Sequence, residues 1–363
     1  MSGLTSVEQG AALSHPRPEI LALTGLRGLA AVGVVASQVG VWRTAPAFLH
    51  DLVAGASLGV PFFFLLSGFV LAYNYPSLTV WSGRQALGRY AMARVARLAP
   101  LFVVVGLGVL ILGALNGGDW IRTVFGPEAW FVGTALLLYC AYPLLARVVA
   151  TSPATSLLVA FALQLVVLGV RLTTGSDAWL YRNPLVWVPD LVIGMIVAGL
   201  ATRTAYSVQR PTTRAAYWMY RLTTTRAAYL VQAGAVIYAV AVIILFGSSS
   251  AVQYSALWSA PLALVILTVA ATPGSWTSVL LSTNVMIRLG VISYALFLLH
   301  TIVVHGFGPV HAGSLANGLL AIAWIALAIV VAEGAHRYLG APARRTLLNH
   351  ARRTASEVRS NAS

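Results

Sequence analysis

The chain has 363 residues, of which 59% are hydrophobic and only 9% are charged, and its mean hydropathy is +0.83. Soluble globular proteins average about 25% charged residues, so this composition excludes a soluble fold, and the high hydrophobicity excludes a disordered chain. The formal net charge is +14. Because the arginines lie between long apolar runs rather than in one patch, we expect no nucleic-acid partner and interpret the chain as an all-α protein of the lipid bilayer.

Ten apolar stretches are long enough to cross a hydrocarbon core, for which a helix needs about 20 residues. They cover residues 20–43, 52–76, 92–115, 129–150, 155–172, 185–202, 229–247, 255–272, 286–307 and 315–339. The first is too long for the apolar region of a cleavable signal peptide. We therefore predict a polytopic domain of ten transmembrane helices over residues 20–340, after a loose segment at 1–19 and before a basic tail at 341–363.

The placement of the arginines predicts the orientation of the spans. Nineteen arginines fall on one side of the ten predicted spans and four on the other. By the positive-inside rule, both termini are expected in the cytoplasm and the protein in the cell membrane. The longest polar connection, 203–228, is cytoplasmic in this arrangement and contains TTRAAY twice. This repeat predicts either a basic amphipathic helix or a short duplication without function.

The first predicted span, LTGLRGLAAVGVVASQVG, contains two costly polar side chains. Arg27 and Gln38 are eleven residues apart, about three helical turns and 16 Å, so they share one helix face. Such a stripe can hold a phosphate at Arg27 and a reactive group near Gln38. The equally good alternative is that Arg27 extends to the membrane interface and Gln38 bonds a neighbouring helix.

Polar positions also interrupt the second and third spans. In GVPFFFLLSGF, Ser67-Gly68 breaks an aromatic run, which predicts close helix packing rather than a nucleophile. In RYAMARVARLAP, Arg94 and Arg97 lie on one helix face. Their guanidinium groups suit bidentate phosphate binding, although a cluster of this kind is more often a positive-inside anchor.

The ninth predicted span, RLGVISYALFLLH, carries Ser293 and His300 two turns apart on one face. A single histidine in an apolar helix is more often a structural group than a catalyst. Near the end of the tenth span, the spacing of Glu333, His336 and Arg337 predicts local pairing at a helix end.

Six segments in this order resemble the acyltransferase-3 family of bacterial membrane O-acyltransferases. They are LTGLRGLAAVGVVASQ (23–38), LGVPFFFLLSGFVLAY (58–73), RYAMARVARLAP (89–100), AWFVGTALLLYCAYP (129–143), VPDLVIGM (188–195) and RLGVISYALFLLH (288–300). The resemblance implies a ten-helix protein that takes an acyl group from acyl-CoA in the cytoplasm. It passes the group to a hydroxyl on a sugar, glycolipid or secondary metabolite.

The resemblance also implies roles for individual residues. It makes Arg27 the first-helix arginine and Arg94 and Arg97 the R-x-x-R pair, all three expected to bind acetyl-CoA or propionyl-CoA as the acyl donor. The remaining matches are the W…Y…P frame of Trp130, Tyr139 and Pro143 and the late segment of Ser293, Tyr294 and His300. We predict catalytic roles for Gln38, Tyr139 and His300 and acceptor contacts for Ser67, Trp130 and Ser293. No metal is expected.

Two positions depart from the family pattern. Gln38 stands where the family usually has a histidine regarded as the general base, and a glutamine cannot take up a proton near neutral pH. We favour a substituted histidine at this position, because glutamine preserves its size and polarity, and natural divergence is the alternative. Ala135 stands where the family tends to carry a glutamate, which we interpret as subfamily divergence.

For the acceptor, the resemblance favours a macrolide antibiotic slightly over an envelope sugar or glycolipid. A transporter or flippase is the alternative from another functional class, with the intramembrane arginines along its substrate path. It predicts internally repeated halves, and the sequence shows no such similarity.

Overall fold

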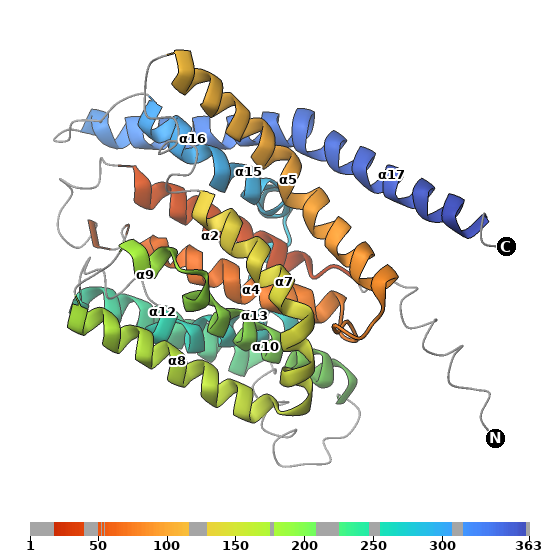
Figure 1. Cartoon of the computed structure of the whole chain (residues 1–363). Helices are drawn as coiled ribbons and strands as arrows, with labels where there is room; N and C mark the ends of the chain where they lie inside the picture. The colour runs from red at the N-terminus through yellow and green to blue at the C-terminus, as the bar shows by residue number, and fades with distance from the viewer. Residues whose placement is uncertain are drawn as a thin grey trace.

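The computed structural model of the chain describes residues 18–39, 50, 51, 53, 55–115, 129–174, 178–207, 225–246, 255–306 and 315–360. Every regular element in these ranges is helical, which confirms the predicted all-α class for this part of the chain (Figure 1). The α-helices are α2 (Leu21–Gln38), α4 (Gly59–Asn74), α5 (Arg84–Leu115), α7 (Ala129–Thr151), α8 (Pro153–Thr174), α9 (Ala178–Arg182), α10 (Val188–Ser207), α12 (Thr225–Phe246), α13 (Ser259–Ala271), α14 (Trp276–Leu281), α15 (Asn284–Gly306), α16 (Leu315–Ala335) and α17 (Ala341–Ser360). Short 3₁₀ turns lie at Ala56–Leu58, Pro184–Trp187 and Ser255–Leu257, and a π-helical turn lies at His336–Gly340.

Eight helices among the described residues are long and apolar enough to cross a membrane. The predicted spans at 255–272 and 286–307 coincide instead with two shorter apolar stretches, Ser259–Ala271 and Asn284–His300. The chain is therefore a multi-pass helical membrane protein with eight candidate spans in its described part, and the predicted number of ten is not confirmed. Most of the predicted amphipathic connection at 203–228 lies outside the described residues.

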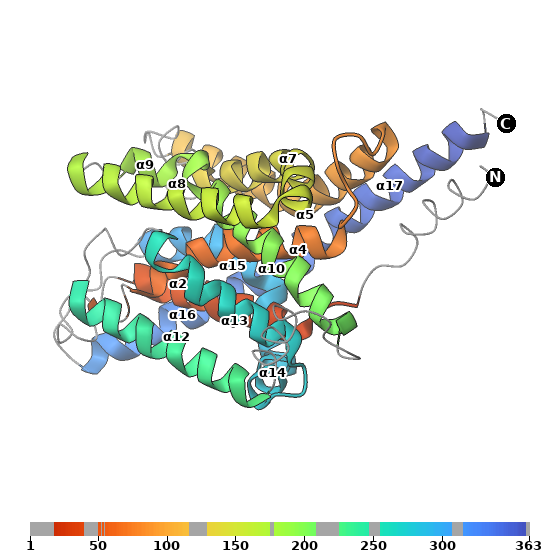
Figure 2. The same cartoon turned by 90° about the horizontal axis from the view of Figure 1, so that it is seen from below.

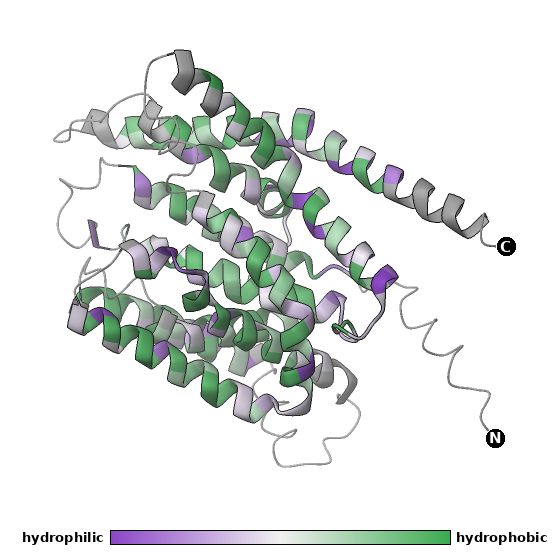
Figure 3. Ribbon diagram, in the orientation of Figure 1, coloured by the Kyte–Doolittle hydropathy of each residue, from purple (hydrophilic) through white to green (hydrophobic). Residues whose placement is uncertain are grey.

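Helices α4 and α10 form the centre of the bundle. In the part of each helix that is long enough to cross a membrane, 56% of the residues are buried for α4 and 72% for α10. The corresponding share is 17% for α5, α8 and α12. Figure 2 shows α4 and α10 between the layer of α7 and α8 and the layer of α12 and α13. Apolar side chains of the outer helices, such as Leu158 and Leu165 of α8, are exposed, in agreement with lipid on that side. Figure 3 shows that hydrophobic residues predominate along these helices.

Glycines allow two helix pairs to approach very closely. A Cβ atom on Gly28 of α2 would lie 2.6 Å from the backbone nitrogen of Gly290 on α15, and one on Gly290 would overlap the carbonyl of Thr24. In the same way, a Cβ on Gly68 of α4 would overlap the carbonyl of Leu191 on α10. Helix association in lipid depends on such close packing of small residues. The close packing predicted at Ser67-Gly68 is therefore confirmed.

The end of the chain continues the helical structure beyond the last span. Helix α16, the π turn and α17 follow one another without a break, so the basic segment expected as a polar tail is helical over Ala341–Ser360. Arg288 of α15 forms an ion pair with Glu333 of α16, its Nε donating to Oε2 at 2.8 Å. The local pairing predicted for Glu333 thus includes a partner on another helix. Helix α17 packs against α5 and extends past the bundle at the end where α2 begins (Figure 1).

Candidate active site

Six of the nine residues predicted for the site line one narrow cavity of about 70 Å³ within the bundle. This inner cavity is lined from α2, α4, α5, α7 and α15, of which α2 and α15 meet at the crossing of Gly28 and Gly290. Its polar lining consists of Arg27, Ser67, Arg94, Arg97, Tyr139, Ser293 and Tyr294. Phe63, Leu66, Phe131 and Phe297 are among its apolar lining residues. The cavity therefore combines three guanidinium groups with a mainly apolar wall.

Arg27 is held in the cavity wall by the backbone of α15. Its Nε and Nη2 donate to the carbonyl oxygen of Gly290 at 3.1 and 2.5 Å. Ser293 Oγ donates to the same oxygen at 2.8 Å. The contact between Gly28 and Gly290 makes this possible, because only a short distance between α2 and α15 brings the arginine to that carbonyl. A guanidinium has five N–H donors, so Arg27 retains donors for a ligand.

Arg94 lies among three tyrosine rings. Its Nη2 donates to the hydroxyl of Tyr75 at 3.1 Å, and its guanidinium carbon lies 5.3 Å from the Tyr75 ring centre and 5.9 Å from those of Tyr90 and Tyr139. Such positions favour cation–π attraction. The Nε of Arg94 is buried and has no hydrogen-bond partner in the structure. The rings therefore orient this arginine while leaving a donor that a bound anion can satisfy.

Hydrogen bonds between helices fix these tyrosines. Tyr90 donates to the carbonyl of Tyr139 at 2.7 Å and so joins α5 to α7. Tyr142 donates to the carbonyl of Tyr75 at 2.7 Å, and Tyr294 of α15 donates to that of Leu98 at 2.8 Å, one residue beyond Arg97. The residues predicted for the site did not include Tyr75, Tyr90 or Tyr142. Their signal was the unusual density of tyrosines around an intramembrane arginine.

A larger outer cavity of about 660 Å³ adjoins the inner one and shares part of its lining. The two share Arg27, Arg94 and Arg97, together with Leu66 and Val70. The outer cavity adds polar residues from the start of α2 and the segment before it, from the end of α4 and the turn after it, and from the start of α17. They are Glu19, Thr24, Tyr73, Asn74, Tyr75, Ser77 and Arg344. Its charged lining is thus four arginines and one glutamate, a net charge of +3.

No carboxylate within the described ranges forms an ion pair with Arg27, Arg94 or Arg97. Glu19 is the acidic residue of the outer cavity, and its Oε1 accepts a hydrogen bond from Thr24 Oγ1 at 2.7 Å. Ala135, at the position expected for a glutamate, lines the inner cavity and adds no charge there. Three clustered cations without a paired anion repel one another, so the site is electrostatically prepared for an anionic ligand.

Three predicted site residues lie elsewhere. Gln38 is the last residue of α2, its side chain is exposed, and it is absent from the described lining of both cavities. The single slot expected to join Arg27 to Gln38 is therefore not formed by the described residues. Helical periodicity puts the two on one face, but of the two only Arg27 lies in the described lining of the cavities. The catalytic role of Gln38 stays a prediction.

His300 and Trp130 lie behind the apolar wall of the inner cavity. His300 is buried, and its Nδ1 lies 2.6 Å from the carbonyl oxygen of Phe297, so that nitrogen donates. The imidazole also packs on the Phe297 ring, with ring centres 5.6 Å apart. Trp130 packs on Tyr181 and Trp187. His300 therefore adjoins the lining residue Phe297, and Trp130 adjoins the lining residue Phe131.

Comparison with known proteins identifies the family of the chain. The family model described as "Acyltransferase domain", the acyltransferase-3 family, matches residues 20–332. The chain belongs to the acyltransferase-3 family. It is also similar to "Protein 2 in picA locus" from Rhizobium radiobacter, with 31% identity over 199 residues, covering 51% of this chain and 98% of the relative. No solved structure matches the chain. The family match covers the whole lining of the inner cavity, and it covers that of the outer cavity except for Glu19 and Arg344.

Proposed function

We propose that this membrane acyltransferase transfers an acetyl or propionyl group from acyl-CoA to a hydroxyl of a macrolide or sugar-containing acceptor. The observation that carries the proposal is the pair of connected cavities. A wide outer cavity with a net charge of +3 leads into a narrow, mainly apolar one, and Arg27, Arg94 and Arg97 line both.

The shape and charge of these cavities suit an acyl-CoA. The coenzyme carries its phosphates at one end and its thioester at the end of a flexible, mostly neutral arm. Phosphates in the outer cavity would accept hydrogen bonds from the arginines, which match phosphate oxygens in geometry and charge. The neutral arm would pass along Leu66 and Val70, which line both cavities, and bring the thioester into the inner cavity.

The reaction balances without a further reactant. The acceptor hydroxyl oxygen attacks the thioester carbonyl carbon, a carbon–oxygen bond forms, and the carbon–sulfur bond breaks. The hydroxyl proton ends on the departing sulfur, which gives free coenzyme A. In this proposal Tyr139 and His300 orient the acceptor or stabilise the developing oxyanion, and Ser67, Trp130 and Ser293 shape the acceptor pocket. A wall of phenylalanines keeps bulk water, and thus hydrolysis, out of the inner cavity.

Gln38 is not part of the described lining of either cavity, so a role for position 38 in this reaction rests on the family resemblance, in which a glutamine there supplies no proton acceptor for the hydroxyl. General-base catalysis contributes about 10²–10⁴-fold to a rate. Gln38→His is therefore expected to raise turnover by one order of magnitude or more, whereas Gln38→Ala should not. Equal turnover by both variants would show that position 38 does not act on the hydroxyl proton.

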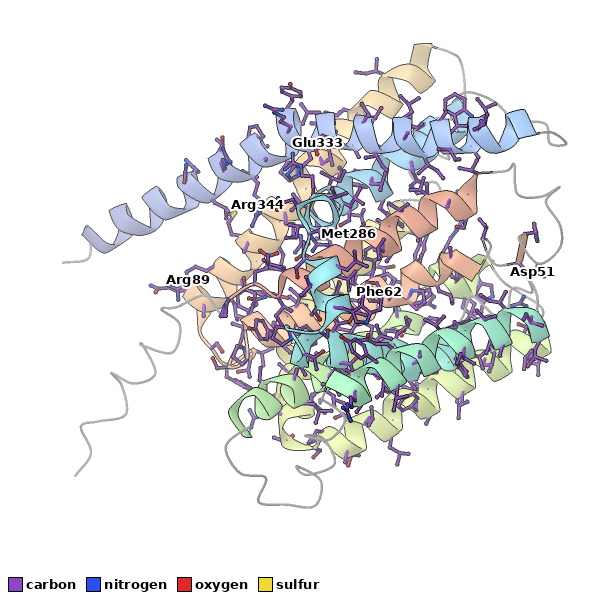
Figure 4. The ribbon with its side chains drawn as sticks, turned by 180° about the vertical axis from the view of Figure 1, so that it is seen from behind. Asp51, Phe62, Arg89, Met286, Glu333 and Arg344 are labelled. Carbon is purple, nitrogen blue, oxygen red and sulfur yellow. The ribbon has the colours of Figure 1, made fainter. Side chains whose placement is uncertain are left out.

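The direct test uses acyl-CoA with a radiolabelled acyl group, the purified protein and a panel of macrolides and glycans. We expect labelled ester on a macrolide, and label on an envelope glycan instead would redirect the acceptor. Arg94→Gln and Arg97→Gln should abolish labelling. Arg89→Gln is the matched control, because Arg89 is an exposed arginine of the same helix outside both cavities (Figure 4). Movement of an acceptor across the membrane without a covalent product would refute the enzyme and favour a transporter.

A further inference from the structure

One arginine of the outer cavity belongs to none of the segments shared with the family. Arg344, on the first turn of α17, lines this cavity together with the three intramembrane arginines. It lies beyond residue 332, where the family match ends. Figure 4 shows Arg344 between α17 and α5, and α17 packs against α5. The sequence around it gives only a basic helix, so its place at the cavity is a result of the tertiary structure.

The position of Arg344 differs from that of the other arginines in one respect. Arg27, Arg94 and Arg97 line both cavities, whereas Arg344 lines the outer one alone. Of the four arginines, Arg344 is therefore the one in the part of the outer cavity that lies away from the inner cavity. Its side chain is exposed, so solvent reaches it and an incoming ligand meets it at the entrance.

The charged groups around Arg344 indicate which kind of ligand it is suited to bind. It interacts electrostatically with Arg97, a like charge, and no carboxylate of the described chain forms an ion pair with it. Without Arg344 the outer cavity would carry three arginines against Glu19, whereas a coenzyme A molecule brings about four negative charges at neutral pH. A fourth guanidinium at the mouth brings the cavity close to the charge of that ligand.

The position of Arg344 is supported from both sides. Helix α17 follows α16 through the π turn at His336–Gly340, and α16 is tied to α15 by the ion pair of Glu333 with Arg288. Helix α15 also supplies the carbonyl that holds Arg27. One continuous set of contacts thus connects Arg344 to the inner arginine, and irregular π turns of this kind are frequent at functional sites.

From this arrangement we propose that Arg344 binds the 3′-phosphate of coenzyme A, at the end of the molecule remote from the thioester. The inference rests on the proposed donor and adds α17 to its binding site. With the thioester in the inner cavity, the pyrophosphate reaches Arg27, Arg94 and Arg97. The 3′-phosphate, which is farther from the sulfur along the molecule, reaches the cavity mouth.

The test is equilibrium binding of three probes to the full chain in phosphatidylcholine nanodiscs. Coenzyme A carries all three phosphates, dephospho-coenzyme A lacks the 3′-phosphate, and pantetheine lacks all of them. Arg344→Gln is expected to weaken coenzyme A binding about three- to tenfold, as for one partly exposed charge-assisted contact. It should leave binding of the other two probes within twofold of the unaltered chain.

Arg345→Gln is the matched control, because Arg345 is the adjacent exposed arginine of α17 and does not line the cavity. It should change coenzyme A binding less than twofold. If both variants lost coenzyme A affinity equally, the effect would be one of general surface charge, and the inference would be overturned. A loss by Arg344→Gln that persists with dephospho-coenzyme A would overturn the assignment to the 3′-phosphate, and one that persists with pantetheine would show a merely structural effect.

The same experiment separates this inference from the proposed function. If the unaltered chain binds no coenzyme A, both fail. If it binds coenzyme A and Arg344→Gln binds it equally well, only the role of Arg344 fails. The acyl-CoA-dependent enzyme would then stand with three phosphate-binding arginines.

Discussion

Gly28 offers the sharpest test of how the fold positions the site. In Gly28→Ala the new Cβ would lie 2.6 Å from the backbone nitrogen of Gly290, and ordinary contact begins near 3.4 Å. Helices α2 and α15 must therefore separate by about 0.8 Å at their crossing to restore ordinary contact, because well-packed interiors do not absorb an extra methyl group. The perturbation is one methyl group, placed next to Arg27 and outside the cavity.

The same displacement would weaken the anchor of Arg27. Its hydrogen bonds to the Gly290 carbonyl, now 3.1 and 2.5 Å, would lengthen past or to the edge of bonding distance. Overpacking of this kind costs about 1–3 kcal/mol, and a hydrogen bond from a charged group is worth about 1.5–3 kcal/mol. We expect a lower melting temperature and coenzyme A affinity reduced about tenfold.

The assay is thermal melting with coenzyme A titration in the same detergent. Gly33→Ala is the control on the same helix, because its Cβ would meet Ala56 at 3.4 Å, an ordinary contact. We expect it to leave both quantities unchanged. If Gly28→Ala also matched the unaltered chain in melting temperature and in affinity, the glycine crossing would not be what positions Arg27.

Three further changes test other parts of the structure. Tyr75→Phe removes the hydroxyl that accepts from Arg94 but keeps the ring, so coenzyme A affinity should fall about two- to fivefold in the same titration without loss of folding. Gly68→Leu should prevent the crossing of the two central helices and leave no monodisperse protein in size-exclusion chromatography; a monodisperse variant would contradict the packing. Arg288→Gln breaks an exposed ion pair with Glu333 and should cost less than about 1 kcal/mol, measured as a small shift in melting temperature.

The arginines of the site explain why its residues could be predicted one by one but not as an assembly. A guanidinium within an apolar span is costly, so Arg27, Arg94 and Arg97 stand out in any reading of the sequence. The sequence does not distinguish arginines that bind a ligand from arginines that anchor a helix at the membrane interface. Only the shared cavities, to which α2 and α5 each contribute, distinguish a ligand site from a set of anchors.

Helical periodicity predicted the site residues less well than did the energetic cost of placing a polar side chain in an apolar span. It places Arg27 and Gln38 on one face, yet the structure puts Arg27 in the cavity wall and leaves Gln38 exposed at the end of α2. A face is a direction around one helix, whereas enclosure depends on how far neighbouring helices extend along it. The same reasoning applies to Ser293 and His300, of which the first lines the cavity and the second lies behind Phe297.

Composition and hydropathy alone determined that this chain is helical, enters the membrane many times and carries buried arginines. These properties follow from the cost of placing backbone and charged groups in hydrocarbon, which depends on residue type and run length. The tertiary structure alone decided that Arg344 joins those arginines, that Tyr75 and Tyr90 lie against Arg94, and that two cavities share part of their lining. The physical reason is that close helix crossings bring together residues hundreds of positions apart, and the geometry of a crossing belongs to no single segment.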